Sequence, residues 1–155
     1  KGMPTLHILE GFVCRDTYEI VRTLQSRFGN QLLAGKVVIY PDAAGQAQST
    51  SSTKTDHQIL REGGLRVMAQ RSNPNVQESI AHCNALLHNQ RIKVNIDSCP
   101  NLVESLEMWS WDEDGNKPVK GGEHDMSHAG DAFRYLCWGA MNGGNRQMAR
   151  GLRQY

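Results

Sequence analysis

The stretch that decides the fold reads His124-Asp-Met-Ser-His-Ala-Gly-Asp-Ala-Phe-Arg-Tyr-Leu-Cys-Trp138. Ser127 can cap a helix, and the apolar spacing after it predicts that this helix runs from about Ser127 to Met141. The residues expected on its core-facing stripe are Ala129, Ala132, Phe133, Leu136, Cys137 and Ala140. On the neighbouring face His128 and Asp131 lie one turn apart, so the imidazole and the carboxylate can share one ligand.

A second acidic residue, Asp42, ends a predicted strand. The run Lys36-Val-Val-Ile-Tyr40 is typical of a short strand covered on both faces, and Pro41-Asp42 terminates it. Ligands usually bind at the carboxyl ends of strands in α/β sheets, so Asp42 is a candidate site residue. A plainer interpretation stays open for each acid. Pro41-Asp42 can simply start a turn, and the helix dipole alone favours Asp131 in a first turn.

Strands and helices alternate along the chain, which predicts an α/β sheet with helices on its faces. The other strands are expected at residues 5–13, 65–69 and 92–96. The other helices are expected from Asp16 to Phe28 with a stop at Gly29-Asn30, at 56–62 behind Thr55 or Asp56, after 73–75, and from a cap at Asn101 to Trp109. Residues 43–55 are expected to form a mobile loop and 111–122 a hairpin or exposed loop. These elements predict one domain over residues 1–142 and a basic C-terminal tail over 143–155.

Composition is typical of a globular domain. The chain has 155 residues, 39% of them hydrophobic and 21% charged, and its formal net charge of +1 argues against binding nucleic acid through bulk positive charge. No apolar run approaches the roughly 20 residues that a membrane-spanning helix needs, so a soluble protein is expected. The four cysteines form no C-x-x-C pair, which favours reduced thiols, and Cys99 and Cys137 are expected to be buried as small hydrophobic residues.

Asp42 comes from one segment and His128 and Asp131 from another, and together they suit a hard divalent cation. Since no thiolate or cluster of histidines accompanies them, Mg²⁺ or Mn²⁺ fits better than zinc. Two such ions, roughly 4 Å apart, can activate a water molecule and stabilise the leaving oxygen of a phosphate ester. The pattern therefore indicates hydrolysis of a phosphodiester.

Three motifs taken together resemble a known family. They are Tyr40-Pro-Asp42-Ala-Ala-Gly45 before a Ser/Thr-rich loop, Cys99-Pro-Asn-Leu102, and His128-x-x-Asp131-Ala-x-Arg-Tyr135. In this order, and over most of the chain, they resemble the C-terminal nuclease domain of the large terminase subunit of tailed bacteriophages. The resemblance implies a ribonuclease H-like mixed sheet flanked by helices. It also implies an endonuclease that cuts concatemeric double-stranded viral DNA during genome packaging.

The resemblance further implies roles for individual residues. Asp42 would be the acidic metal ligand after a central strand and Asp131 the ligand on the final helix, in a two-metal Mg²⁺ or Mn²⁺ site. His128 would be an auxiliary ligand or would position the attacking water. Asp125 is near enough in sequence to support these ligands, although a solvated loop acid explains it as well.

Contacts to the DNA backbone are expected from basic side chains, because lysine and arginine bind phosphates without reading sequence. The candidates are Arg134, Lys54, Lys117 and Lys120. Ordinary solvated charges are the alternative explanation for the lysines. An intrahelical pair with Asp131 is the alternative for Arg134.

The family pattern begins with a strand that carries the first catalytic Asp. Neither Glu10 nor Asp16 sits in such a strand, so the first strands, and with them one metal ligand, are expected to be missing from the chain. The resemblance implies a full-length protein with a terminase ATPase domain, working with the small terminase subunit and the portal in the cytoplasm of a bacterial host. The chain has no Gly-x-x-x-x-Gly-Lys-[Ser/Thr] phosphate loop, so ATP-driven translocation would belong to that other domain.

Two other functions stay open. Another ribonuclease H-like nuclease, such as a junction resolvase or an integrase-type recombinase, would prefer four-way junctions to linear duplex. A non-catalytic module that docks on DNA or on the portal would show no cleavage. For the nuclease, the segment 111–122 is expected to border the cleft and to limit access to it.

Overall fold

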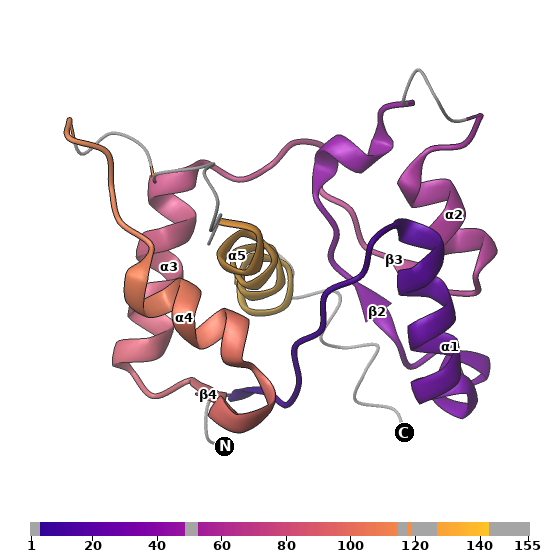
Figure 1. Ribbon diagram of the computed structural model, residues 1–155, viewed down its shortest axis with the longest axis horizontal. Coiled ribbons are helices and arrows are strands. Elements are labelled where there is room, and N and C mark those ends of the chain that lie inside the picture. Colours follow the sequence, from indigo (N-terminus) through magenta and orange to yellow (C-terminus); the bar gives the residue numbers. More distant parts are fainter. Residues whose placement is uncertain (1–3, 49–52, 115–117, 119–126, 143–155) are drawn as a thin grey trace. The chain divides into compact units, whose positions relative to one another are not determined.

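The computed structural model describes residues 4–48, 53–114, 118 and 127–142. The chain divides into two compact units: among the described residues, unit 1 comprises 4–12, 74–114, 118 and 127–142, and unit 2 comprises 13–48 and 53–73. In the described part, each unit contains one pair of parallel strands with helices packed beside it (Figure 1). The predicted α/β class is therefore confirmed. The predicted tail at 143–155 lies outside the described residues.

Unit 1 joins the start of the chain to its second half. Its elements are β1 (Leu6–Ile8), α3 (Val76–His88), β4 (Ile92–Val94), the 3-10 turn η2 (Ile96–Ser98), α4 (Pro100–Met108) and α5 (Ser127–Met141). Strand β1 pairs in parallel with β4, with Leu6 opposite Ile92. Helix α5 lies against both α3 and α4 (Figure 1). The buried residues of its core are Ile8, Cys83, Leu86, Ile92, Cys99, Leu102, Phe133 and Cys137.

Unit 2 is built from a contiguous stretch of chain in its described part. Its elements are α1 (Thr17–Leu33), β2 (Val38–Ile39), the 3-10 turn η1 (Ala43–Gln46), α2 (Asp56–Glu62) and β3 (Arg66–Val67). Strand β2 pairs in parallel with β3, with Val38 opposite Arg66, and α1 packs against α2. The buried residues of its core are Val21, Leu24, Ile59, Leu60 and Leu65. The predicted strand at Lys36–Tyr40 is thus shorter than expected, and Val38 and Ile39 are only partly buried.

Two helices of unit 2 begin where their capping residues predict. The Asp16 side chain accepts a hydrogen bond of 2.7 Å from the Glu19 N–H at the start of α1. The Thr55 hydroxyl accepts from the Gln58 N–H, and the Gln58 side chain accepts from the Thr55 N–H, which completes a capping box at the start of α2. Of the two predicted caps for this helix, Thr55 is the correct one.

The predicted stop at Gly29-Asn30 coincides with a break between two helical segments of α1, and the second segment was not predicted. The helix kinks at Phe28 (φ −128°, ψ 23°) and continues to Leu33. Ala34 is its C-cap, and the φ of +65° at the following Gly35 allows the Gly35 and Lys36 N–H groups to bond back to carbonyls of the last turn. A glycine ends a helix through this left-handed conformation, and Gly29 does not adopt it.

Two details of unit 1 also differ from expectation. Helix α4 begins at Pro100 with Cys99 in the cap position, so Asn101 lies inside the first turn and is not the cap. The predicted bounds of α5 are confirmed, but its buried face is rotated: Ala132 is exposed, whereas Gly130 and Arg134 are buried. Prediction of the buried face from hydrophobicity alone missed Gly130, which lies close to Trp109 and Ser105, and Arg134, which is hydrogen-bonded to Ser79.

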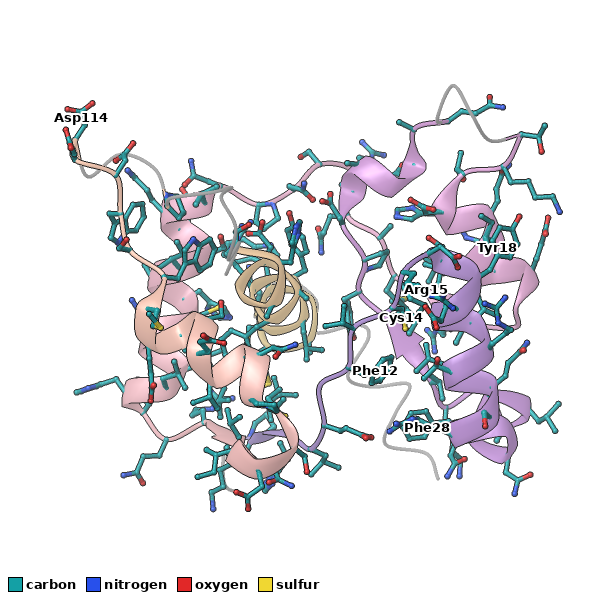
Figure 2. All side chains as sticks on the ribbon, in the orientation of Figure 1. Phe12, Cys14, Arg15, Tyr18, Phe28 and Asp114 are labelled. Atoms are coloured by element: carbon teal, nitrogen blue, oxygen red, sulfur yellow. The ribbon has the colours of Figure 1, made fainter. Side chains whose placement is uncertain are left out.

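The segment after α4 forms part of the predicted hairpin. Trp111 pairs with Pro118 through an antiparallel bridge, and the described chain between them runs as far as Asp114 (Figure 2). In unit 2, Tyr18 in the first turn of α1 and Phe28 at its kink are 52% and 36% exposed (Figure 2). None of the described helices combines the length and the apolar character that crossing a membrane requires.

Candidate functional site

Asp42 lies three residues after the end of β2 and caps the turn η1 in unit 2. Its Oδ1 accepts one hydrogen bond of 2.7 Å from the Ala44 N–H and another of 2.7 Å from the Asn73 side-chain amide. The residue is exposed. The predicted position at the carboxyl end of a strand is therefore confirmed, and so is the plainer prediction that Pro41-Asp42 starts a turn.

Two further hydrogen bonds tie the segment 70–73 to the turn η1. The Asn73 side-chain oxygen accepts from the Ala43 N–H at 2.9 Å, so one amide group binds both the carboxylate and the following backbone. The Gln46 side chain donates to the Gln70 carbonyl at 2.7 Å. The role of Asn73 was not predicted, because its position before Pro74 was interpreted only as the opening of a helix.

His57, in the first turn of α2, also contacts Asp42. Its Nε2 lies 2.8 Å from the backbone carbonyl oxygen of Asp42, and only 1% of the residue is exposed. Sequence reasoning missed this histidine. The available signal was weak: a histidine two residues after a helix cap, in a helix otherwise expected to be an ordinary amphipathic one.

Asp131 lies in unit 1, on α5, in a charged and largely buried environment. Its Oδ1 accepts from Arg134 Nη2 at 2.8 Å and from Arg134 Nε at 3.3 Å. The side chains of Arg134 and Asp131 are 4% and 15% exposed. Arg134 Nη1 also donates to the Ser79 hydroxyl at 2.8 Å, and that hydroxyl donates to the Asn75 carbonyl at 2.6 Å. This network links α5 to the start of α3.

The predicted DNA contact of Arg134 is not retained. The alternative weighed for it, an intrahelical pair with Asp131, is the arrangement that the structure shows. A buried guanidinium bonded to both Asp131 and Ser79 does not face a phosphate backbone. Spacing could not distinguish the two outcomes, because both require an arginine one turn after the acid.

The remaining predicted site residues fall into two groups. His128 is exposed on α5, one turn before Asp131, and Lys54 is exposed in unit 2. Lys54 pairs with Glu62 at 2.6 Å, and this hydrogen bond raises the pKa of the lysine, which stays positively charged near neutral pH. Asp125, Lys117 and Lys120 lie outside the described residues.

Asp42 and Asp131 belong to different units, so their convergence on one cation pair stays a prediction. Within the described residues, no three His, Cys, Asp or Glu side chains are grouped as a metal site. Of the two predicted acidic ligands, Asp42 is exposed and accepts hydrogen bonds from amide groups, and Asp131 accepts hydrogen bonds from a guanidinium. Oxygen ligands of this kind suit Mg²⁺ or Mn²⁺.

Comparison of the chain with protein-family models, with curated proteins and with solved structures finds no match. The resemblance to the terminase nuclease domain therefore depends on the motifs in the chain itself.

Proposed function

We propose that the chain is the nuclease domain of a phage-type large terminase subunit, with a ribonuclease H-like fold. It would hydrolyse phosphodiester bonds of concatemeric double-stranded DNA, using Mg²⁺ or Mn²⁺. The order of its three motifs supports this proposal, and so does the α/β character of both units. The proposed partners are the terminase ATPase domain, the small terminase subunit and the portal, in the cytoplasm of a bacterial host.

The observation that carries the proposal is the setting of Asp42. Its carboxylate is exposed at the carboxyl end of a parallel strand, which is where α/β proteins commonly place ligand-binding groups. The Ala44 and Asn73 donors to Oδ1 are uncharged amides that orient the carboxylate. A hard divalent cation requires an oriented, negatively charged oxygen ligand of this kind.

Asp131 would supply a second carboxylate, and Arg134 would hold it in place. Both bonds from Arg134 reach the same oxygen, Oδ1, and an ionised carboxylate has about four acceptor positions over its two oxygens. The ion pair therefore orients the side chain through Oδ1. His128, exposed one turn earlier, would assist as an auxiliary ligand or by positioning water.

When bound, the cations would lower the pKa of a water molecule and stabilise the leaving oxygen of the DNA strand. The residues of the chain would hold and orient those ions through carboxylate oxygens. Lys54, exposed in unit 2, would contact the DNA backbone.

Mn²⁺ binding by the 155-residue chain tests the proposal. Paramagnetic broadening of amide NMR signals reports which residues lie near the ion, so signals around Asp42 and Asp131 should broaden at the lowest Mn²⁺ concentrations. Asp42→Asn and Asp131→Asn should each weaken this effect, since an amide is a much poorer ligand than a carboxylate. Asp97→Asn, at an exposed acid of η2, is the matched control and should change nothing.

Cleavage of plasmid DNA provides the second measurement. Nicking that requires Mn²⁺ and is lost in both substituted chains supports the endonuclease. Broadening or nicking that is indifferent to both substitutions would remove Asp42 and Asp131 from the site and overturn the proposal. A strong preference for four-way junctions over linear duplex would reassign the chain to the resolvase class.

A further inference from the structure

The imidazole of His57 makes a directed contact with Asp42. Its Nε2 lies 2.8 Å from the Asp42 carbonyl oxygen, and a carbonyl oxygen can only accept a hydrogen bond. Nε2 therefore carries the proton and donates it. The bond links α2 to the peptide group that follows Asp42, although the two residues are 15 positions apart in the chain.

The other ring nitrogen argues against a role in packing alone. Nδ1 is buried and has no hydrogen-bond partner among the described residues. Leaving a polar atom buried and unpaired costs about 1–3 kcal/mol, and an apolar side chain at this position would avoid that cost. The presence of a histidine is therefore explained by the bond from Nε2 to Asp42.

The ring also supports the turn that begins at Asp42. A Cβ atom at Gly45 would lie 3.0 Å from both Cδ2 and Nε2 of His57, so the backbone of η1 rests against the edge of the imidazole. Asn73 holds the same turn from its side-chain amide, which bonds to the Asp42 carboxylate and to the Ala43 N–H. Backbone and carboxylate of Asp42 are thus each held by a residue from another segment.

We infer that His57 and Asn73 are positioning residues, which hold the Asp42 carboxylate in the orientation that binds a divalent cation. This inference rests on the metal-dependent function proposed above. Neither residue would touch the ion. Groups that hydrogen-bond to a metal ligand fix its orientation, and their removal typically lowers metal affinity about 10–100-fold. A cap that serves only to stabilise the turn would have no such effect on affinity.

The matched substitutions His57→Gln and His57→Met separate the hydrogen bond from packing. Both side chains are similar in length and both lose the ring, but only glutamine can donate to the Asp42 carbonyl. Mn²⁺ affinity of the 155-residue chain, measured by electron paramagnetic resonance of the unbound ion, should fall by about tenfold or more in His57→Met and stay near the parent value in His57→Gln. In the metal-free protein, the Ala44 amide, which donates to Asp42, should exchange with solvent faster only in His57→Met.

Asn73→Ala gives a second test at an exposed position, where the fold is not at risk. It should lower Mn²⁺ affinity by about tenfold or more, whereas Asn84→Ala, at an exposed residue of α3, should not. Equal affinities in the two His57 variants, or an unchanged affinity in Asn73→Ala, would overturn the inference while leaving the proposed function intact. A parent chain that binds no Mn²⁺ near Asp42 would overturn both the inference and the proposed function. The Ala44 exchange rates would then show whether the hydrogen bonds from His57 and Asn73 stabilise only the turn.

Discussion

The two units hold their acidic candidates in opposite ways. In unit 1, Asp131 is largely buried and is paired with a buried arginine that is itself bonded to Ser79. In unit 2, Asp42 is exposed, and amide groups from Ala44 and Asn73 orient its carboxylate. An arginine orients a carboxylate but also supplies a positive charge that competes with a cation, whereas an amide orients it without that competition.

The stability of unit 1 is expected to depend on its carboxylate more than the stability of unit 2 depends on Asp42. Removing the charge of Asp131 or of its partner disturbs the core of unit 1, since both groups are desolvated. Asp42 is exposed and is not part of the core of unit 2, so removing its charge should disturb that core much less. Asp42 is therefore the better residue for separating metal binding from stability, and substitutions at Asp131 need a stability measurement beside them.

The largest expected effect comes from Arg134→Met. Loss of the guanidinium leaves the Asp131 carboxylate desolvated and without this ion pair, which should destabilise unit 1 by about 3–5 kcal/mol. Hydrogen exchange, read peptide by peptide, should accelerate in α3 and α5 and stay unchanged in unit 2. Adding Asp131→Asn to Arg134→Met should recover part of the loss, because it removes the uncompensated charge. Lys93→Met, at an exposed residue of β4, should have little effect, and a similar loss there would contradict the interpretation.

Alanine at two helical glycines should change the stability of the units in opposite directions. A Cβ at Gly130 would lie 2.5 Å from the Trp109 ring and 2.9 Å from Ser105 Oγ, so Gly130→Ala should cost about 1–3 kcal/mol through overpacking. A Cβ at Gly29 would meet nothing within 4 Å, so Gly29→Ala should stabilise α1 by about 0.5–1 kcal/mol. Denaturant midpoints and local exchange rates measure both. Stabilisation by Gly130→Ala would show that α4 and α5 are not in close contact.

A smaller effect is expected from Thr55→Ala. The hydroxyl caps the helix that carries His57, and its loss should cost about 1 kcal/mol. Amide exchange should accelerate first in α2. Mn²⁺ affinity should fall only slightly, in proportion to the fraction of molecules in which the first turn of α2 is unfolded. Thr53→Ala, at an exposed residue two positions earlier, is the control.

Thiol labelling should distinguish the units without changing stability. Cys83, Cys99 and Cys137 of unit 1 are at most 6% exposed, whereas Cys14 of unit 2 is partly accessible. The hydrogen bond with Cys83 and burial also raise the pKa of Cys137, so its reactive thiolate is scarce at neutral and mildly alkaline pH. Mass spectrometry after brief alkylation should therefore find label at Cys14 first. Early label at Cys137 would show that unit 1 opens readily.

Local signals in the sequence predicted the helices well. The cap and apolar spacing of α5 gave its bounds, and Asp16 and Thr55 marked two helix starts, because these features act within a few residues of one another. The strands were predicted longer than they are, since the described pairs span only two or three residues. The burial of Cys99 and Cys137 was also predicted correctly, and it follows from their size and polarity.

The surroundings of the candidate site could not be predicted in the same way. Position in the chain identified Asp42 as the end of a strand. His57 reaches it through a backbone carbonyl, an acceptor that every residue carries and that no sequence pattern marks. Asn73 reaches it from 31 residues away, and Arg134 reaches Ser79 across 55. Such contacts depend on how segments pack, which periodicity within one segment does not encode.

The pairing of β1 with β4 has a consequence for biosynthesis. Leu6 leaves the ribosome long before its partner Ile92, and the described residues of unit 2 are made in the interval. The described core residues of unit 2 lie between Val21 and Leu65 and can come together while translation continues, but β1 cannot pair with β4 until residues 92–94 have been made. A nascent chain stalled before residue 92 should therefore already contain the described core of unit 2 but lack the pairing of β1 with β4.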